Sequence, residues 1–264
     1  MNVMPPNAMP TARHATIRVR HELKRRTLSV AGVERLTPAM VRVTLAGDSL
    51  ADFASPAFDD HVKLFFAVAG PDGAPAAEMR DYTPRRFDTA RGLLVVDFAL
   101  HQAGPATDWA ARAAPGQTLE VAGPRGSSVI PDDFDWYLLV GDETALPAIA
   151  RRVEELRPGV PVTTLVAVTG PAEEQAFAPR AGLDARWLHR PAAAADDPAP
   201  VLAALAGIPL PPGEGHVFIA AEAGVARALR RHIVEERGHP REWTKAAGYW
   251  KRGQADASEK AMED

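Results

Sequence analysis

The residues best suited to chemistry or to binding a cofactor lie in Met79–Phe87, where a cation, a phenol and a hydroxyl follow one another closely. In an extended segment alternate side chains share a face, so Arg80 and Tyr82 are expected to point the same way. Pro84 disfavours the helical region for its predecessor, which keeps Thr83 extended. A guanidinium suits a pyrophosphate, while a phenol and a hydroxyl suit a flavin ring. A surface strand with scattered polar groups is the alternative interpretation of these residues alone.

The next segment supplies further polar groups at the end of a predicted strand. Gly92–His101 is an apolar run rich in valine and leucine, typical of a buried strand, and it ends in His101. Gly104–Ala110 then has the composition of a turn that opens a helix, with Thr107 or Asp108 as the N-cap. Amides at a helix N-terminus lack internal partners and favour a bound phosphate. A flavin-binding barrel requires this order of strand, strand and phosphate-binding turn.

Short motifs occur in order along the chain and together resemble a known family. They are Val33–Pro38, Asp60–Phe66, Arg80–Thr83, Asp97–His101, Gly104–Trp109, Gly123–Ser127, Gly141–Ala148, Ala220–Ala223 and Gly248–Gly253. Their combination is similar to that of the siderophore-interacting proteins, which are NAD(P)H-dependent ferric-siderophore reductases of the ferredoxin reductase-like superfamily. The resemblance implies an N-terminal antiparallel FAD-binding β-barrel followed by a Rossmann-like parallel α/β domain that binds NAD(P)H.

The resemblance places the expected cofactor, FAD, on the barrel motifs. His101 is not expected to be a catalytic base, because hydride and electron transfer need no base acting on the substrate. It would instead contact the flavin edge or a phosphate. A buried, hydrogen-bonded histidine is the alternative. The FAD-binding residues expected in this way are Arg80, Tyr82, Thr83, Asp97, Phe98, Leu100, His101, Ala106 and Thr107.

The co-substrate, NADPH or NADH, is expected at the carboxyl ends of the parallel strands, where open α/β sheets bind ligands. No G-x-G-x-x-G fingerprint occurs, but Gly141–Ala145 matches the family's turn, with Gly141 permitting the turn and Thr144 capping the helix. Arg190 lies where related reductases place a basic residue against the adenosine phosphate; a loose surface arginine is the alternative. The expected coenzyme-binding residues are Gly141, Asp142, Glu143, Thr144, Ala145, His189, Arg190 and Glu222.

Two further groups are expected around the flavin. Tyr249 and Trp250 resemble C-terminal aromatic residues that cover or border the flavin in related reductases, although packing within a terminal strand would also explain them. Ferric siderophores often carry negative charge, so cations at the entrance would steer and orient them. The expected substrate-binding residues are Lys63, Arg125, Lys251 and Arg252, and ordinary solvated surface charge is the alternative for each.

The elements that must position these residues change in type along the chain. Residues 1–21 are rich in proline and are expected to be a disordered tail. Between 22 and 132, short segments of alternating polarity predict the strands of a barrel. From 133 to 253, apolar strands alternate with amphipathic helices, which indicates parallel βαβ units, and 254–264 form a second tail. The strands predicted in this second domain are Trp136–Val140, Val162–Val168, Arg186–Leu188 and His216–Ala221.

Composition limits the class of protein. The chain has 264 residues, 46% of them hydrophobic and 24% charged, as in globular proteins. Its net charge of −4 argues against a nucleic-acid partner. Cysteine is absent, which excludes thiolate-bound iron–sulfur centres, and the histidines lack ligand spacing, so no resident metal is expected. Without an apolar span or a secretory signal, a cytoplasmic location is expected. The protein is also expected to be a monomer.

The resemblance implies an oxidoreductase that uses NAD(P)H and FAD to reduce Fe(III) in ferric siderophores and release Fe(II). The flavin is needed because nicotinamide donates electrons in pairs while iron accepts them singly. No side chain is expected to act as a catalytic acid or base. Two other functions stay open, namely a flavin-dependent electron donor to a protein partner and a non-enzymatic siderophore-binding protein.

Overall fold

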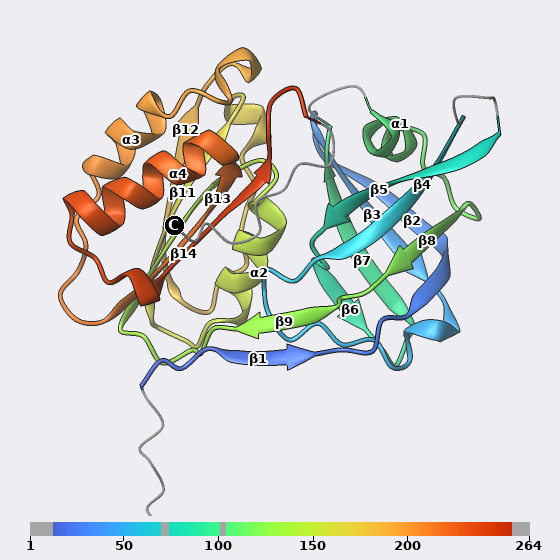
Figure 1. Cartoon of the computed structure of the whole chain (residues 1–264), viewed down its shortest axis with the longest axis horizontal. Helices are drawn as coiled ribbons and strands as arrows, with labels where there is room; N and C mark the ends of the chain where they lie inside the picture. The colour runs from blue at the N-terminus through green and yellow to red at the C-terminus, as the bar shows by residue number, and fades with distance from the viewer. Residues whose placement is uncertain (1–12, 70–73, 101–103, 255–264) are drawn as a thin grey trace, which may run out of the picture.

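The computed structural model describes residues 13–69, 74–100 and 104–254, which form two domains side by side (Figure 1). The N-terminal domain is an antiparallel sheet, and the C-terminal domain is a parallel sheet with helices on both faces. A two-stranded ribbon of β1 (Ile17–Arg20) and β9 (Gly126–Val129) runs along the bottom of the view between them.

The N-terminal sheet has seven strands and curls into a barrel. From residue 41 to residue 46, in its second strand in sequence, buried and half-buried residues alternate, because successive side chains of a strand point to opposite faces. The sheet closes where Tyr82 packs on Phe98 from a distant strand, with ring centroids 4.4 Å apart. Its strands, in the order β5-β4-β8-β2-β3-β7-β6, are β2 (Arg25–Thr37), β3 (Met40–Ala46), β4 (Val62–Ala69), β5 (Pro75–Tyr82), β6 (Arg86–Asp88), β7 (Leu93–Ala99) and β8 (Thr118–Ala122). The helix α1 (Pro105–Ala111) packs against β4 and β7.

The C-terminal sheet has five parallel strands in the order β12-β11-β10-β13-β14. They are β10 (Trp136–Asp142), β11 (Pro161–Val168), β12 (Gly182–His189), β13 (Gly215–Glu222) and β14 (Thr244–Trp250). The strands β10 and β13 are buried along their whole length, as expected for strands covered on both faces. The strand β12 is longer than the predicted Arg186–Leu188, because exposed polar residues at its start hide the apolar pattern.

Helices cover both faces of the parallel sheet. The helix α2 (Leu146–Glu155) lies on the face toward the barrel, while α3 (Ala199–Ala206) and α4 (Ala223–Arg231) cover the other face (Figure 1). None of the helices in the described part of the chain is long and apolar enough to cross a membrane. Shorter helical turns lie at Asp48–Leu50, Pro171–Glu173, Ala192–Ala194, His232–Glu236 and Arg241–Trp243.

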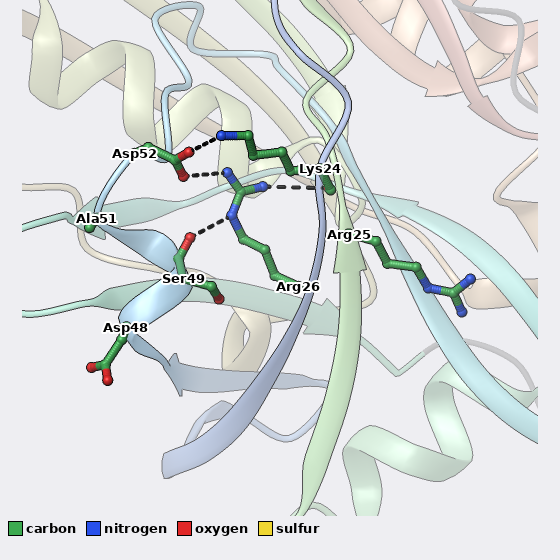
Figure 2. Close-up of a pocket in the computed structure, with 7 residues that line it drawn as sticks. All are labelled: Lys24, Arg25, Arg26, Asp48, Ser49, Ala51 and Asp52. Carbon is green, nitrogen blue, oxygen red and sulfur yellow. Dashed lines mark hydrogen bonds and ion pairs between the residues drawn. The ribbon is translucent and has the colours of Figure 1, made fainter.

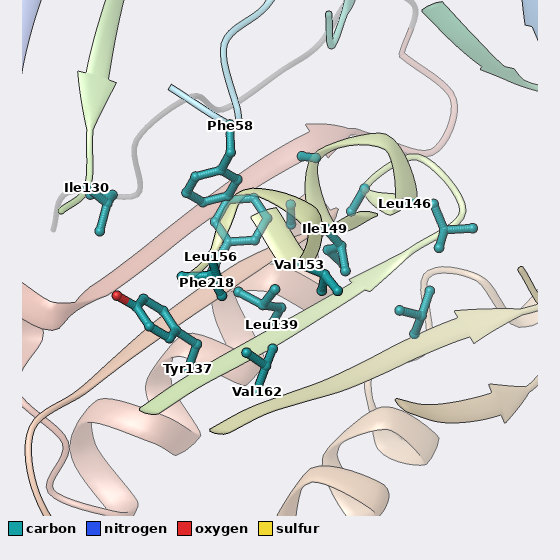
Figure 3. Packing of buried hydrophobic residues seen from close by; sticks show 14 of the residues in the cluster. Phe58, Ile130, Tyr137, Leu139, Leu146, Ile149, Val153, Leu156, Val162 and Phe218 are labelled. Atoms are coloured by element: carbon teal, nitrogen blue, oxygen red, sulfur yellow. The ribbon is translucent and has the colours of Figure 1, made fainter. Parts of the chain in front are cut away.

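The core beneath α2 extends into the interface between the domains. Leu146, Ile149 and Val153 of α2 pack on the sheet, as their spacing predicts for one helix face. Phe58, which precedes β4, joins the same cluster and meets Phe218 of β13 edge to face, with ring centroids 5.0 Å apart (Figure 3). The two domains therefore share one apolar core on this side.

Part of the segment predicted as an N-terminal tail is ordered. Residues 17–20 form β1, which pairs antiparallel with β9, so the prediction of disorder is wrong for this part. The preceding His14 stacks on Phe134 with ring centroids 3.8 Å apart and contacts Asp133 and Glu214 at 2.6 and 3.0 Å. These partners lie more than a hundred residues away, so composition alone could not reveal them. Residues 1–12 and 255–264 lie outside the described residues.

Candidate active site

Arg80 and Tyr82 lie at the end of β5, next to the C-terminal domain. The Arg80 side chain is 20% exposed and donates to Glu78 at 2.5 Å. The Tyr82 ring packs on Phe66 and Phe98, and burial raises the pKa of its phenol, while the charge of Arg80 opposes that rise. Arg80 and Tyr82 are two residues apart in β5, so their side chains lie on the same face of the strand, as the spacing predicts.

The C-terminal aromatic pair joins the two predicted cofactor regions. Thr83 is buried, and its hydroxyl hydrogen-bonds the phenol of Tyr249 in β14. Burial raises the pKa of Tyr249 well above its ordinary value. The next residue, Trp250, donates from Nε1 to Asp142 Oδ2 at 2.8 Å. Consecutive residues of β14 therefore contact the end of β5 in one domain and the end of β10 in the other.

Phe98 of β7 faces the barrel core, while the preceding Asp97 lies on the opposite face of the strand. Asp97 is buried and accepts two hydrogen bonds from Arg42, at 2.7 and 2.8 Å. Phe98 is fully buried in the barrel core, and Leu100 packs at the edge of the same core. The side chains of Asp97 and Phe98 are thus not presented to a cofactor, so a contact with FAD from this stretch would involve the backbone. The predicted contact of His101 lies outside the described residues.

The helix α1 begins one turn earlier than predicted. Its N-cap is Gly104, which has no side chain to satisfy the first amides, and neither Thr107 nor Asp108 is the cap. The sequence misled here because Pro105 fits the first turn of a helix, where a missing N–H costs nothing. The amides of Ala106 and Thr107 therefore lie in an uncapped first turn, which is a suitable place for a phosphate.

Asp142 is the centre of the turn that follows β10. Its Oδ1 accepts from the backbone N and the hydroxyl of Thr144, at 2.9 and 2.5 Å. Its Oδ2 accepts from the backbone N of Glu222 at 3.2 Å as well as from Trp250. Thr144 therefore closes the turn through Asp142 and does not cap α2, whose N-cap is Ala145. One carboxylate ties together the ends of β10, β13 and β14.

Gly141 is required by close packing and not by an unusual turn. Its φ is not positive, in contrast to what a left-handed turn would need. A Cβ at this position would lie 2.6 Å from the Cβ of Ala145 and 2.7 Å from the carbonyl oxygen of Ala220. The absence of a side chain lets β10, β13 and the start of α2 approach one another.

Glu143 and Arg190 meet at the carboxyl ends of β10 and β12. Arg190 Nη2 donates to Glu143 Oε2 at 2.8 Å, and Arg190 is only 4% exposed. Burial raises the pKa of Glu143, the neighbouring Asp142 raises it further, and Arg190 opposes both. Arg190 is thus no loose surface arginine, and it would have to leave Glu143 to contact a phosphate. His189 is exposed and pairs with a different carboxylate, Glu174, at 2.8 Å.

Glu222 lies at the same edge of the sheet, at the end of β13. Its carboxylate accepts from the backbone N of Gly224 and Val225, so it is the N-cap of α4. An acidic cap is favourable at the positive end of the helix dipole. The position of Glu222 agrees with the prediction, and its carboxylate is committed to the helix.

The four predicted rim cations differ in their surroundings. Lys63 contacts Asp81 at 3.0 Å and remains 36% exposed. Arg125 is exposed in the loop before β9, and Lys251 follows Trp250 at the end of β14. Arg252 turns to the loop after β12, where it pairs with Asp196 at 2.7 Å. Arg252 is therefore held against the C-terminal domain rather than free to meet an anionic substrate.

Sequence reasoning missed a set of charged residues between the domains. Arg151 and Glu154 of α2 contact the segment that follows Tyr82, and Arg85 in that segment is 4% exposed. Arg85 belongs to Met79–Phe87, the stretch best suited to chemistry. Its basic charge next to Pro84 was the sequence signal that could have revealed it. Nothing in the pattern of α2 indicates that two arginines on it are buried.

A separate cavity of about 510 Å³ opens at the start of β2 (Figure 2). The cations that line it are already paired, since Lys24 and Arg26 both contact Asp52. None of the predicted site residues lines this cavity, so it is not part of the candidate active site. Its lining residues are Lys24, Arg25, Arg26, Asp48, Ser49, Ala51 and Asp52.

The fold is that of the ferredoxin reductase-like class. In this class an antiparallel barrel is followed by a parallel sheet of the nucleotide-binding type, and here polar residues meet where the two domains join. The cytochrome b5 reductase domain of Ulva prolifera nitrate reductase has this fold, with a TM-score of 0.61 at 12% identity, covering 84% of this chain and 96% of that one.

The chain belongs to the siderophore-interacting protein family. The model of the siderophore-interacting FAD-binding domain matches residues 29–75 and 69–128, and that of the siderophore-interacting protein matches residues 134–253. The NADPH-dependent ferric-chelate reductase of Escherichia coli is 37% identical over 251 residues, covering 88% of this chain and 95% of that protein. A siderophore utilization protein from T. fusca has a TM-score of 0.85 at 39% identity, covering 94% of this chain and all (100%) of that one.

Proposed function

We propose that this protein reduces Fe(III) held by a siderophore, with NADPH or NADH as the electron source and FAD as the cofactor. The observation that carries the proposal is the contact of Tyr249 with Thr83 and of Trp250 with Asp142. These contacts bring the end of β5 and the end of β10 to the same aromatic pair. A hydride donor bound at β10 and a flavin bound at β5 would then face one another across a short gap.

The residues of the barrel fit FAD. The uncapped first turn of α1 offers the amides of Ala106 and Thr107 to a phosphate, which favours negative charge at this helix end. Arg80 offers a guanidinium to the pyrophosphate, in exchange for its exposed partner Glu78. Tyr82 offers a protonated phenol and one face of its ring. When bound, FAD accepts a hydride and passes on single electrons, which this chain's side chains cannot do.

The residues at the edge of the parallel sheet hold and orient the coenzyme. The carboxyl ends of β10, β11 and β13 converge there, as in other open α/β sheets that bind nucleotides. Asp142 fixes the turn and the indole of Trp250, while Tyr249 shields the neighbouring space from water. No proton has to be taken from the substrate, so no side chain is assigned as acid or base.

Lys63, Arg125 and Lys251 are the cations that we assign to the substrate entrance. Their positive charges would attract and orient an anionic ferric chelate, and the effect should weaken as salt is raised. Hard oxygen ligands hold Fe(III) more tightly than Fe(II), so reduction itself loosens the metal, and no covalent bond of the siderophore has to break. We place the reaction in the cytoplasm, where reduced nicotinamide coenzymes are available, and assign it to a monomer.

The test is anaerobic reduction of the protein reconstituted with FAD. Addition of NADPH should bleach the flavin absorbance, and a ferric siderophore should restore it while Fe(II) is captured by a colorimetric chelator. Restoration only by a flavodoxin-like protein would instead assign the chain as an electron donor to a protein partner. A colourless protein that binds siderophore but cannot be reconstituted with FAD would contradict the enzymatic proposal.

A further inference from the structure

Three consecutive residues that follow Tyr82 each contact the C-terminal domain. The hydroxyl of Thr83 bonds Tyr249, and the carbonyl oxygen of Pro84 accepts from Arg151 Nη1 at 3.0 Å. Arg85 forms a fork with Glu154, at 2.9 and 2.5 Å. We call Thr83–Arg85 the attachment segment, and all three of its residues are buried.

Arg151 holds a second piece of the barrel at the same time. Its Nη1 also donates to the hydroxyl of Ser55 at 2.9 Å, and its Nη2 donates to the carbonyl oxygen of Ser55. The Ser55 hydroxyl in turn donates to Asp60, a buried carboxylate that also accepts from Ser127 at 2.7 Å. One guanidinium from the C-terminal domain is therefore bonded to two barrel segments that are far apart in sequence.

The Arg85 fork also extends to a buried carboxylate on the outer face of the barrel strand β7. Arg85 Nε lies 3.8 Å from Asp97, the carboxylate that Arg42 holds from the neighbouring strand β3. A guanidinium that faces a carboxylate through two parallel hydrogen bonds fixes direction as well as distance. With side chains only 5% and 18% exposed, Arg85 and Glu154 form a directional contact that solvent screens little.

The helix α2 connects these contacts to the coenzyme turn. It starts directly after Gly141–Ala145, and its second half carries Arg151 and Glu154. A helix of this length is a rigid rod, so the position of its second half determines the position of the turn at its start. The flavin motif Arg80–Thr83 overlaps the attachment segment at Thr83. The same helix is therefore bonded beside both predicted cofactor regions.

We propose that Arg151 and Glu154 are positioning residues that set the distance between the flavin-binding strand and the coenzyme-binding turn. Hydride transfer needs the reacting atoms about 3–3.5 Å apart, and a displacement of about 1 Å can cost on the order of a hundredfold in rate. This inference rests on the proposed function for the location of the two cofactors. The underlying claim, that the two residues fix the domains relative to each other, is independent of the electron acceptor.

The distance between the domains can be measured directly because the chain has no cysteine. Thr118→Cys in β8 and Ala185→Cys in β12 place spin labels on exposed positions of the two domains. Pulsed electron resonance on the FAD-loaded double-cysteine protein should give one narrow distance distribution. Arg151→Gln and Glu154→Gln, each added to this background, should broaden it or shift its mean.

The rates of the two half-reactions, reduction of the flavin by NADPH and its reoxidation by a ferric siderophore, give the second readout. Arg151→Gln and Glu154→Gln should slow bleaching of the flavin by NADPH about tenfold or more. Reoxidation of dithionite-reduced protein by a ferric siderophore should be slowed much less, since it does not use the coenzyme turn and two of the three entrance cations, Lys63 and Arg125, lie in the same domain as the flavin-binding strand. The dissociation constant for FAD should change less than about threefold, because neither residue is assigned to FAD.

Arg157→Gln is the matched control. Arg157 follows α2 and makes a similar number of hydrogen bonds, but they go to Asp132 and Phe134 in the segment directly before β10 and not to the attachment segment. It should leave the distance distribution and the rate of bleaching unchanged. If Arg151→Gln fails to fold, Glu154→Gln, which preserves shape, carries the test.

Unchanged distances and bleaching rates in the Arg151 and Glu154 variants would overturn the proposal. An equal loss of both half-reactions would also overturn it, since it would indicate a general structural role. If the wild type does not reduce ferric siderophores at all, the proposed function fails while the distance measurement still decides whether the two residues fix the domains.

Discussion

At the scale of single residues, Arg80 is the side chain on which FAD affinity should depend most. Arg80→Ala should weaken FAD binding by about 1.5–3 kcal/mol, the value of a hydrogen bond to a charged group, or roughly tenfold or more in affinity. Fluorescence titration of the apoprotein with FAD measures this. Arg91→Ala, at an arginine with a 79% exposed side chain in the same domain, is the control and should leave the affinity unchanged. Equal affinities for Arg80→Ala and wild type would remove Arg80 from the FAD site.

The role of Arg190 is tested by comparing the activity of a variant with NADPH and with NADH. If it contacts the 2′-phosphate, Arg190→Ala should lower kcat/KM for NADPH and leave NADH nearly unaffected. The single variant also leaves Glu143 buried and unpaired, which is costly by itself. The comparison is therefore made in a Glu143→Gln background, where no carboxylate is stranded. A selective loss with NADPH in that background supports the phosphate contact, and equal losses with both coenzymes contradict it.

The sequence predicted which of the candidate residues lie near one another better than it predicted their partners. The proximity of Arg80 and Tyr82 follows from strand spacing, and the turn Gly141–Ala145 follows from its place after an apolar strand. The commitment of Asp97 to Arg42, and of Arg190 to Glu143, could not be predicted because such pairs depend on strand order. A residue's type indicates the chemistry available to it, but its nearest opposite charge decides how that chemistry is used.

At the scale of elements, the junction of β10 and α2 depends on Gly141. Gly141→Ala should lower the free energy of unfolding by about 1–3 kcal/mol, the usual cost of overpacking, because its Cβ would meet Ala145 and the backbone of Ala220. Urea unfolding measures the change. Gly170→Ala, in the turn after β11, is the matched control, because a Cβ there meets nothing within 4 Å. Equal stabilities of the two variants would contradict the packing role of Gly141.

Elements with a strong periodic pattern were predictable, and elements formed by distant pairing were not. The central strands β10, β11 and β13 follow from short apolar runs, since strands buried on both faces have no polar side, whereas β14 was not predicted as a strand. The strand β1 was missed because it is only four residues long, it follows a proline-rich segment, and its order comes from pairing with β9. The start of α1 was misplaced because Gly104 caps it without a side chain that the sequence could show.

At the scale of the whole molecule, stability should fall below neutral pH because of His216. Burial holds the pKa of His216 well below its ordinary value of 6.5, and the charges of Arg152 and Lys245 lower it further. Below about pH 6.5 the unfolded chain therefore binds a proton that the folded chain does not, and stability decreases by up to about 1.4 kcal/mol per pH unit.

His216→Leu removes this titration. Its free energy of unfolding should depend less steeply on pH between about 5.5 and 6.5 than that of the wild type, as measured by urea unfolding at several pH values. His189→Leu, at an exposed histidine, is the control and should keep the wild-type slope. An unchanged slope in His216→Leu would show that His216 is not responsible.

The relation between the two domains is the part that the sequence did not reveal. Attachment contacts such as Arg85 with Glu154 join residues that no local pattern connects, and the shared core through Phe58 is formed only when both domains are present. The composition of each domain indicates its own fold. The interface that decides how FAD and coenzyme face each other follows only from the assembled structure.

The most direct measurement is the yield of Fe(II) per coenzyme oxidised, under anaerobic conditions and with a ferric siderophore as the sole acceptor. A hydride carries two electrons and each Fe(III) accepts one, so about two Fe(II) should form for each NADPH, and only in the presence of FAD. Omission of FAD should abolish both coenzyme oxidation and Fe(II) formation. NADPH oxidation without Fe(II), or Fe(II) formation that does not depend on FAD, would contradict a flavin-dependent ferric-siderophore reductase.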